Sequence, residues 1–154
     1  MAILARVVQG IRHMTAPQFD DSETFNIIGA AIQVHAVLGG GMLERVYLRA
    51  VEIELEARGI PSAREPPIVI EYRGVHIGTY RPDFICYDSV IVEIKASGDL
   101  VAAHYAQTLH YLMASKGSRA LLINFGRDRL HWKRFFRPRP MSTGGAGHQG
   151  PGGA

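Results

Sequence analysis

The sequence predicts an α/β fold, with a small mixed central sheet flanked by helices. Three observations lead to this prediction. Two stretches with helical periodicity come first, β-branched runs follow, and a third helical stretch then precedes a short, continuously apolar run. Such a run is typical of a strand that is buried on both faces. The predicted order is helix, helix, three strands, helix and strand, with one further strand at the end.

The first predicted helix spans residues 22–38. Ser22 is a suitable N-cap residue, because its side-chain oxygen can accept from a free backbone N–H of the first turn. Phe25, Ile28, Ile32 and Val34 then recur near helical spacing up to Leu38, which predicts that they form the buried face.

The second predicted helix spans residues 42–58. The glycines at positions 39–41 separate it from the first helix, and Gly59 followed by Pro61 ends it. Its apolar positions form one stripe, as expected for a helix that packs on one face. The stripe consists of Leu43, Val46, Tyr47, Ala50, Val51 and Leu55.

Strands follow the second helix. Runs rich in β-branched residues alternate with turn signals such as Arg73-Gly74 and Asp88-Ser89. The two strands on either side of Asp88-Ser89 are predicted to form a β-hairpin. The predicted strands are residues 68–72, 75–86, 90–96, 120–125 and 130–136, and residues 100–115 form the third helix.

At 154 residues the chain has room for one domain, which we assign to residues 22–136. Residues 1–21 are predicted to form a flexible segment, and either Met1 or Met14 is the start of translation. Residues 137–154 are rich in glycine and proline and hold no large apolar residue beyond Met141. We therefore expect a disordered tail there.

Composition narrows the classes of protein to consider. No apolar run approaches the roughly 18 residues that a membrane-spanning helix needs, so we expect no membrane insertion. The single cysteine, Cys86, excludes an internal disulfide and favours a reducing, cytoplasmic location. The seven histidines show no zinc-binding spacing, and the glycines at 39–41 lack the Lys-Ser/Thr of a phosphate-binding loop.

The net charge of +3 hides an uneven distribution. Residues 1–100 hold 9 basic and 13 acidic residues, whereas residues 101–154 hold 8 basic residues and 1 acidic residue. A basic cluster of this kind suits a polyanion such as nucleic acid. A solvated basic end without a ligand explains the charge equally well. The cluster consists of Arg119, Arg127, Arg129, Lys133, Arg134, Arg137 and Arg139.

Two acidic residues stand at matching positions of the predicted hairpin. Asp83 and Glu93 are equidistant from Asp88, so an odd number of loop residues makes them face each other, where like charges repel. Lys95 lies two residues beyond Glu93 and points to the same face. Two acids and a lysine on one face suit a divalent metal beside a phosphate. The alternative is an ion pair without a catalytic role.

Short motifs recur along the chain in a fixed order. Arg81-Pro82-Asp83 precedes Glu93-Ile94-Lys95, and the run from Gly41 to Tyr47 matches G-x-x-E-x-x-Y. With these motifs the chain resembles the PD-(D/E)XK nuclease superfamily and, within it, a small bacterial family, the GxxExxY proteins. The resemblance covers about residues 24–136 and implies a restriction-endonuclease-like α-β-β-β-α-β core. The other matching stretches are Ala30–His35, Tyr80–Phe84, Val92–Ala96, Ala106–Leu112 and Leu121–Phe125.

The resemblance implies a metal-dependent nuclease, with DNA rather than RNA as the expected substrate. Asp83 and Glu93 would hold Mg²⁺ or Mn²⁺ through carboxylate oxygens. Lys95 would orient or help deprotonate the attacking water and stabilise charge on the phosphate. Glu44 would be a further metal ligand or would hold a metal-bound water. Gln107 would orient the site or touch the nucleic-acid backbone.

Position alone offers simpler explanations for several polar residues. Glu44 stands at the start of a helix, where an acid stabilises the helix dipole. Gln107 fits a polar position at a helix–sheet edge equally well. Tyr47 and Tyr111 are more typical of core residues with a hydrogen-bonded hydroxyl than of residues in a binding site.

Two other functions are compatible with the sequence. The first is a catalytically silent nucleic-acid-binding or regulatory module, which the basic residues between positions 119 and 139 would carry. The second is a protein-interaction domain that forms a homodimer through an exposed sheet edge. The intact acidic positions favour the nuclease.

Overall fold

The computed structural model describes residues 21–138. Most of the predicted flexible segment, the start at Met14, Arg139 and the predicted tail beyond Pro138 lie outside the described residues. None of the helices in residues 21–138 is long and apolar enough to cross a membrane. The elements in chain order are α2 (Ser22–Leu38), α3 (Glu44–Ala57), β1 (Ser62–Arg64), β2 (Ile68–Tyr72), β3 (Val75–Tyr80), β4 (Phe84–Cys86), β5 (Val90–Lys95), α4 (Ala102–Ala114), β6 (Arg119–Asn124) and β7 (His131–Phe136).

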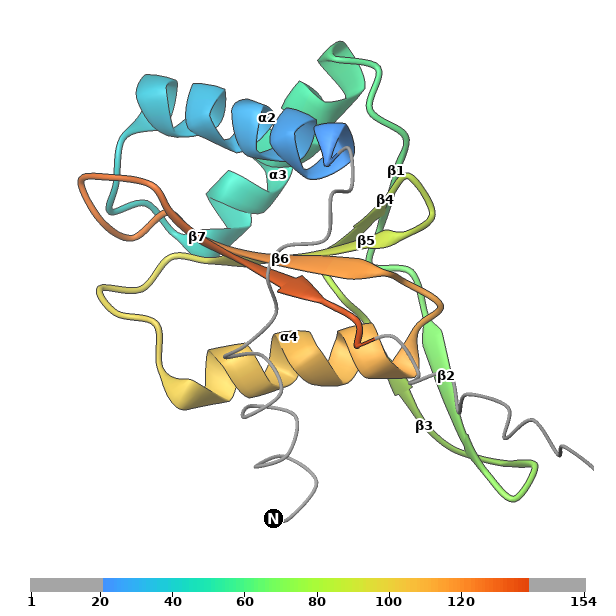
Figure 1. Ribbon diagram of the computed structural model, residues 1–154. Helices are drawn as coiled ribbons and strands as arrows, with labels where there is room; N and C mark the ends of the chain where they lie inside the picture. The colour runs from blue at the N-terminus through green and yellow to red at the C-terminus, as the bar shows by residue number, and fades with distance from the viewer. Residues whose placement is uncertain (1–20, 139–154) are drawn as a thin grey trace, which may run out of the picture.

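Five of the strands form one mixed sheet in the order β1-β4-β5-β6-β7. The central strands β5 and β6 run parallel, and the other neighbours in this sheet run antiparallel. In Figure 1, α2 and α3 cover one face of the sheet and α4 covers the other. The predicted α/β fold with a mixed central sheet flanked by helices is confirmed.

Alternate side chains of β5 divide the core into two layers. Val92 and Ile94 pack with α2 and α3 on one face of the sheet, whereas Ile91 packs with α4 on the other. This division follows from the period of two along a strand. Glu93 and Lys95 alternate in step with Ile91, so β5 presents both on the α4 face.

The buried face of α2 differs from the predicted one. Ile28 and Val34 are buried as expected, but Phe25 and Ile32 are 71% and 47% exposed. Ala30 and Ala31 are buried in their place. Because α2 carries apolar residues on more than one face, periodicity could not identify the side that packs. In α3 the buried residues are Tyr47, Val51 and Leu55, whereas Leu43 and Val46 of the predicted stripe are exposed.

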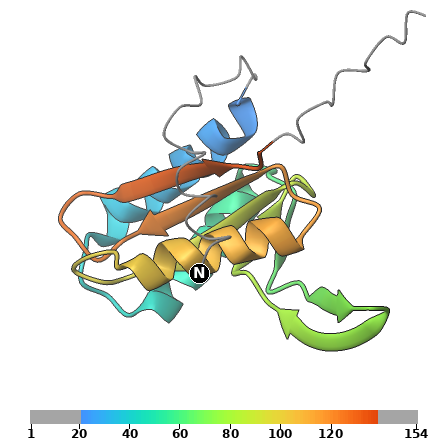
Figure 2. The same cartoon turned by 60° about the horizontal axis from the view of Figure 1, so that its bottom comes forward.

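The predicted strand over residues 75–86 is two strands that belong to different sheets. Pro82 lies between β3 and β4 and has no N–H for a ladder hydrogen bond, which explains the break. In the described structure β2 and β3 pair only with each other, and Figure 2 shows this two-stranded arm (residues 68–80) projecting from the main sheet. The sequence does not predict β1, because its three residues are all exposed and too few to show a period.

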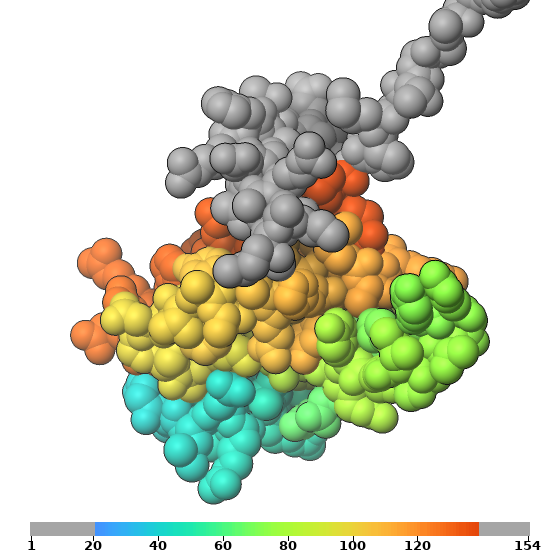
Figure 3. All heavy atoms as spheres, turned by 90° about the horizontal axis from the view of Figure 1, so that it is seen from below, coloured from blue at the N-terminus to red at the C-terminus, as the bar shows by residue number. Residues whose placement is uncertain are grey.

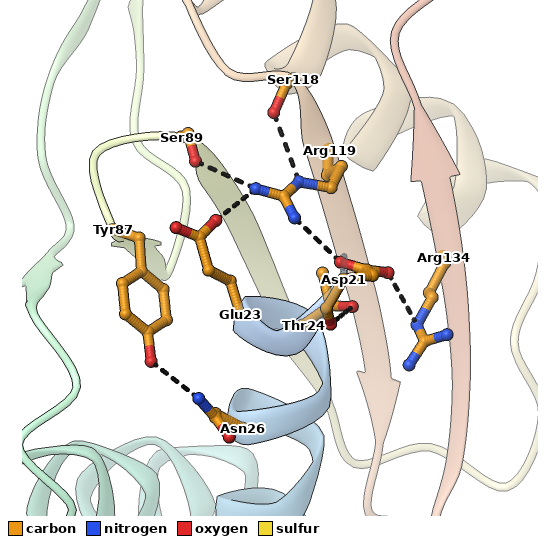
Figure 4. A network of polar contacts seen from close by, with 9 residues as sticks. All are labelled: Asp21, Glu23, Thr24, Asn26, Tyr87, Ser89, Ser118, Arg119 and Arg134. Atoms are coloured by element: carbon orange, nitrogen blue, oxygen red, sulfur yellow. Dashed lines mark hydrogen bonds and ion pairs between the residues drawn. The ribbon is translucent and has the colours of Figure 1, made fainter. Parts of the chain in front are cut away.

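Arg119 joins the start of α2 to the start of β6 (Figure 4). Its guanidinium donates to Asp21 Oδ1 at 2.9 Å and also pairs with Glu23. Arg134 Nε lies 3.6 Å from Asp21 Oδ2. Asp21 occupies the N-cap position that the sequence assigns to Ser22, but its side chain serves these ion pairs and does not cap α2.

This arginine network lies at one end of the parallel pair of strands. Arg119 is opposite Val90 at the start of β5, whereas Lys95 is opposite Asn124 at the far end. The ion pairs that fix α2 therefore lie three strand residues, about 10 Å, from the position of β6 opposite Glu93.

We expect Arg119→Leu to lower the free energy of unfolding by roughly 2–4 kcal/mol, because it leaves Glu23 without its cation and Asp21 with only the longer contact to Arg134. Arg49→Leu is the control, since the pair of Arg49 with Glu52 is more exposed and should contribute less than about 1 kcal/mol. Urea unfolding measures both values. Equal losses in the two variants would contradict a structural role for the network.

Candidate functional site

Asp83 and Glu93 face each other across the hairpin of β4 and β5. Residues 87–89 join the strands, so the loop has the odd length that facing requires. The strand register, continued by one residue, brings Asp83 opposite Glu93. The N–H of Asp83 donates to Glu93 Oε1 at 3.1 Å, and the N–H of Ile94 donates to Asp83 Oδ2 at 2.7 Å. The predicted opposition of the two carboxylates is confirmed.

Burial dominates the electrostatics of this acid pair, Asp83 and Glu93. Only 2% of Glu93 is exposed. Burial, together with the negative charge of Asp83, raises the pKa of Glu93 to about 8. Burial also raises the pKa of Asp83, although the N–H of Ile94 and the charge of Lys95 act in the opposite direction. Without a metal, the acid pair therefore keeps a proton near neutral pH.

Lys95 lies beside the acid pair on the same face of β5. Its Nζ is 3.8 Å from Glu93 Oε2, which is an ion pair but longer than a hydrogen bond. This contact alone does not keep the pKa of Glu93 in its usual range. The ion pair of Lys95 with Glu93 therefore compensates the negative charge of only one of the two acids. An additional cation is needed to ionise both Asp83 and Glu93 at neutral pH.

Glu44 approaches the acid pair from the opposite helical layer. It is the first residue of α3 and is half-buried. Its charge raises the pKa of both Asp83 and Glu93, so it lies within electrostatic reach of them. Over residues 21–138, no group of three or more His, Cys, Asp or Glu side chains is placed to hold a metal ion. Glu44 thus stands near the acid pair without completing a set of three ligands.

Gln107 and Tyr111 come to the same region from α4. Gln107 Nε2 donates to Tyr111 Oη at 3.2 Å. Burial and then the charge of Glu93 raise the pKa of Tyr111, which places its hydroxyl near the acid pair. Its ring is tilted against that of Tyr80, with 5.1 Å between centroids. Tyr111 is only partly buried and lies at the edge of the core, unlike the core position favoured by its residue type. In the sequence, the spacing of four residues between Gln107 and Tyr111 on one helix already indicates that their side chains are neighbours.

Tyr47 behaves as the sequence predicts. Its side chain is fully buried, and its hydroxyl both donates and accepts a hydrogen bond. It is therefore a core residue and makes no direct contact with the acid pair.

The sequence pattern does not single out Asn124, which holds the chain just beyond Lys95. The Asn124 side chain accepts from the N–H groups of Ser97 and Gly126, both at 3.1 Å, and donates to the Ser97 carbonyl at 2.8 Å. Gly126 approaches so closely that a Cβ there would lie 2.2 Å from the Ser97 carbonyl oxygen. The sequence does contain one indication of this role. Asn124 is the one polar residue of the apolar run 121–125, and a buried amide is nearly always hydrogen-bonded.

Most described members of the basic cluster are engaged in structural contacts. Arg119 and Arg134 pair with acidic residues at the start of α2, and Arg127 pairs with Asp99. Arg137 donates to backbone carbonyls at the end of α4 and in the turn after it. A count of charges therefore overstates the surface that this cluster offers to a polyanion.

The donor set at the acid pair suits a hard divalent cation. Mg²⁺ prefers oxygen ligands and is often held by one or two carboxylates together with waters and a substrate phosphate. Asp83 and Glu93 supply two such carboxylates, which repel each other. Glu93 is buried and Asp83 is partly buried. A cation between them would offset both effects.

In the metal-free protein we expect stability to fall as the pH rises from about 5 to about 8. The ordinary pKa of the Glu93 carboxyl is 4.5, and in the folded protein it is about 8. Between these values the folded state holds a proton that the unfolded state has released. Glu93→Gln removes this titration, so its free energy of unfolding should vary less over that range. Urea melts in the presence of a chelator measure the slope.

Glu52→Gln is the matched control. Hydrogen bonds from Arg49 and Arg64 lower the pKa of Glu52, so its contribution is lost only as the pH falls below the ordinary range of a glutamate. This variant should keep the wild-type slope between pH 5 and pH 8. A Glu93→Gln protein that also kept that slope would show that Glu93 does not carry the proton.

Known proteins resemble the chain over most of its length. A model of the PD-(D/E)XK nuclease superfamily matches residues 21–135. Among solved structures, the crystal structure of SSO0001 is similar, with a TM-score of 0.49 and 15% identity over 90% of this chain and 77% of that chain. A comparison with curated proteins finds no match. Because the superfamily match spans most of the chain and includes the hairpin of Asp83, Glu93 and Lys95, the chain belongs to the PD-(D/E)XK nuclease superfamily.

Proposed function

We propose that this protein is a metal-dependent nuclease that hydrolyses phosphodiester bonds of DNA. The observation that carries the proposal is the opposition of the buried Glu93 and the partly buried Asp83, with Lys95 on the same face. Membership of the superfamily supports a nucleic-acid substrate and a divalent metal. The run from Gly41 to Tyr47 further supports a place among the GxxExxY proteins.

Each residue near the acid pair has a role in this proposal. Asp83 and Glu93 would hold Mg²⁺, or Mn²⁺ in its place, and Glu44 would be a further ligand or would hold a water beside the metal. When bound, the metal lowers the pKa of a coordinated water and offsets charge on the phosphate. Lys95 donates to the attacking water or to the phosphate, which orients the one and stabilises charge on the other. The amide of Gln107 orients the site or contacts the nucleic-acid backbone.

A catalytically silent nucleic-acid-binding module fits the structure less well. It would keep the buried Glu93 and the partly buried Asp83 together at a cost of several kcal/mol without using them. The arginines that would carry it are mostly paired, whereas Arg129 and Lys133 are exposed. Binding with a steep salt dependence, without metal-dependent cleavage, would favour the silent module.

A homodimer through a sheet edge stays a prediction. Within residues 21–138, β1 and β7 are edge strands, and each strand of the arm has one unpaired side. Figure 3 shows the arm, coloured green, at the surface beside α4. Light scattering of the purified protein would measure its oligomeric state.

We expect Lys95→Ala to cleave DNA at least about 100-fold more slowly than wild type in the presence of Mg²⁺, because it removes a donor to developing charge. Its melting temperature should stay within a few degrees of wild type, since the ammonium makes only a 3.8 Å contact. Lys116→Ala, at an exposed position after α4 and outside the basic cluster, is the control and should cleave normally. Cleavage that survives in Lys95→Ala would indicate a contaminating nuclease.

We expect Asp83→Ala to bind Mn²⁺ roughly 10-fold or more weakly than wild type, because it removes one of two carboxylate ligands. Titration calorimetry in the presence of a non-cleavable DNA measures the affinity. Asp128→Ala removes an exposed acid and should bind like wild type. Equal affinities in the three proteins would place the metal elsewhere.

A further inference from the structure

The turn between α2 and α3 is held by the side chain of Tyr47. Gly39 and Gly41 have φ angles of 69° and 91°, a region that favours glycine, so this turn lacks side chains that could anchor it. The Tyr47 hydroxyl donates to the carbonyl of Gly39 at 2.6 Å and accepts from the N–H of Met42 at 3.1 Å. One hydroxyl thus bridges both ends of the turn.

The ring of Tyr47 is itself fixed in the core. It stacks on Phe125, with 4.6 Å between ring centroids and 22° between ring planes. The N–H of Phe125 donates to the carbonyl of Lys95 at 2.7 Å. A chain of contacts therefore runs from the glycine turn through two rings to the end of the strand that carries Lys95.

The same turn packs closely on the segment after β6. His35 Nε2 lies 2.8 Å from the carbonyl oxygen of Arg127. A Cβ at Gly40 would lie 2.6 Å from that same oxygen, so no larger residue fits there without displacing the backbone. The position of the turn is thus set by contacts with the segment that joins β6 and β7.

Glu44 follows this turn directly and has few restraints of its own. The N-cap residue of α3, Leu43, makes no side-chain capping hydrogen bond. Leu43 and Val46 are exposed, so they do not anchor the first turn of α3 in the core. The position of Glu44 relative to the acid pair therefore depends on the turn at Met42.

We propose that the hydroxyl of Tyr47 is a positioning group for Glu44. It fixes the glycine turn and thereby sets where α3 begins, although Tyr47 does not touch the acid pair. The inference rests on the proposed function, in which Glu44 assists metal binding at Asp83 and Glu93. The residue three positions after Glu44 is about one helical turn away, so its side chain can reach back to the turn that precedes Glu44.

Tyr47→Phe tests the inference by removing only the hydroxyl. The stacking on Phe125 is kept, so we expect a folded protein whose Mn²⁺ affinity is roughly 10-fold weaker, as is typical when a group that orients a metal ligand is lost. Hydrogen exchange of the peptide spanning residues 39–44 should become faster, because the Met42 N–H loses its acceptor. Tyr87→Phe is the matched control, since that hydroxyl accepts from Asn26 at the other end of the hairpin, and it should match wild type in Mn²⁺ affinity and in exchange at residues 39–44.

A double-mutant cycle with Glu44→Ala separates positioning from general destabilisation. If the hydroxyl acts through Glu44, the double variant should bind Mn²⁺ like Glu44→Ala alone, with no further loss. Gly40→Ala displaces the same turn without changing Tyr47 and should weaken Mn²⁺ binding in the same way. A Tyr47→Phe protein with wild-type Mn²⁺ affinity, or a loss that persists in full in the Glu44→Ala background, would overturn the inference.

Failure of the proposed function gives a different pattern. If wild type binds Mn²⁺ but cuts no DNA, the nuclease proposal fails, while the affinities in the cycle still decide the role of Tyr47. If Glu44→Ala leaves Mn²⁺ affinity unchanged, the role of Glu44 is wrong and the inference fails with it.

Discussion

The placement of a buried and a partly buried carboxylate opposite each other is the constraint on which the rest of this structure depends. Asp83 and Glu93 lie on neighbouring segments of an otherwise apolar hairpin, where neither solvent nor Lys95 fully compensates their charge. Ionising both would cost several kcal/mol in the absence of a cation. The buried apolar residues of β5 and β6 stabilise the fold and so offset the electrostatic cost of this acid pair.

The groups that hold the backbone around the acid pair are mostly uncharged. Asn124 fixes the chain after Lys95 with an amide, and Tyr47 fixes the turn before Glu44 with a hydroxyl. The salt bridges of Arg119 lie at the opposite end of β5. Neutral hydrogen bonds position the chain without adding charge beside the carboxylates. The charges that act on the acid pair are those of Lys95, Glu44 and Glu65, together with a bound cation.

The chemistry of the hairpin could be predicted from sequence because it is local. The equal spacing from Asp88 and the odd loop length together fix the opposition of Asp83 and Glu93, and the period of two fixes the side of Lys95. Features that depend on distant partners could not be predicted. Arg119 pairs with acidic residues almost a hundred positions earlier in the chain. Counting charges along the sequence therefore assigned it to the cluster available to a polyanion. The exposure of Phe25 depends likewise on which face of α2 meets the sheet.

The distance between the arginine network and the acid pair has a consequence for evolution. Three residues of extended strand separate Arg119 from the position opposite Glu93, which amounts to about 10 Å. Substitutions that far apart, without shared partners, combine almost additively. Substitutions at the α2 end should therefore change the stability of the domain with little effect on the acid pair, although Asn26 and Arg119 also bond the turn of the hairpin. A reserve of stability there offsets destabilising changes near the acids.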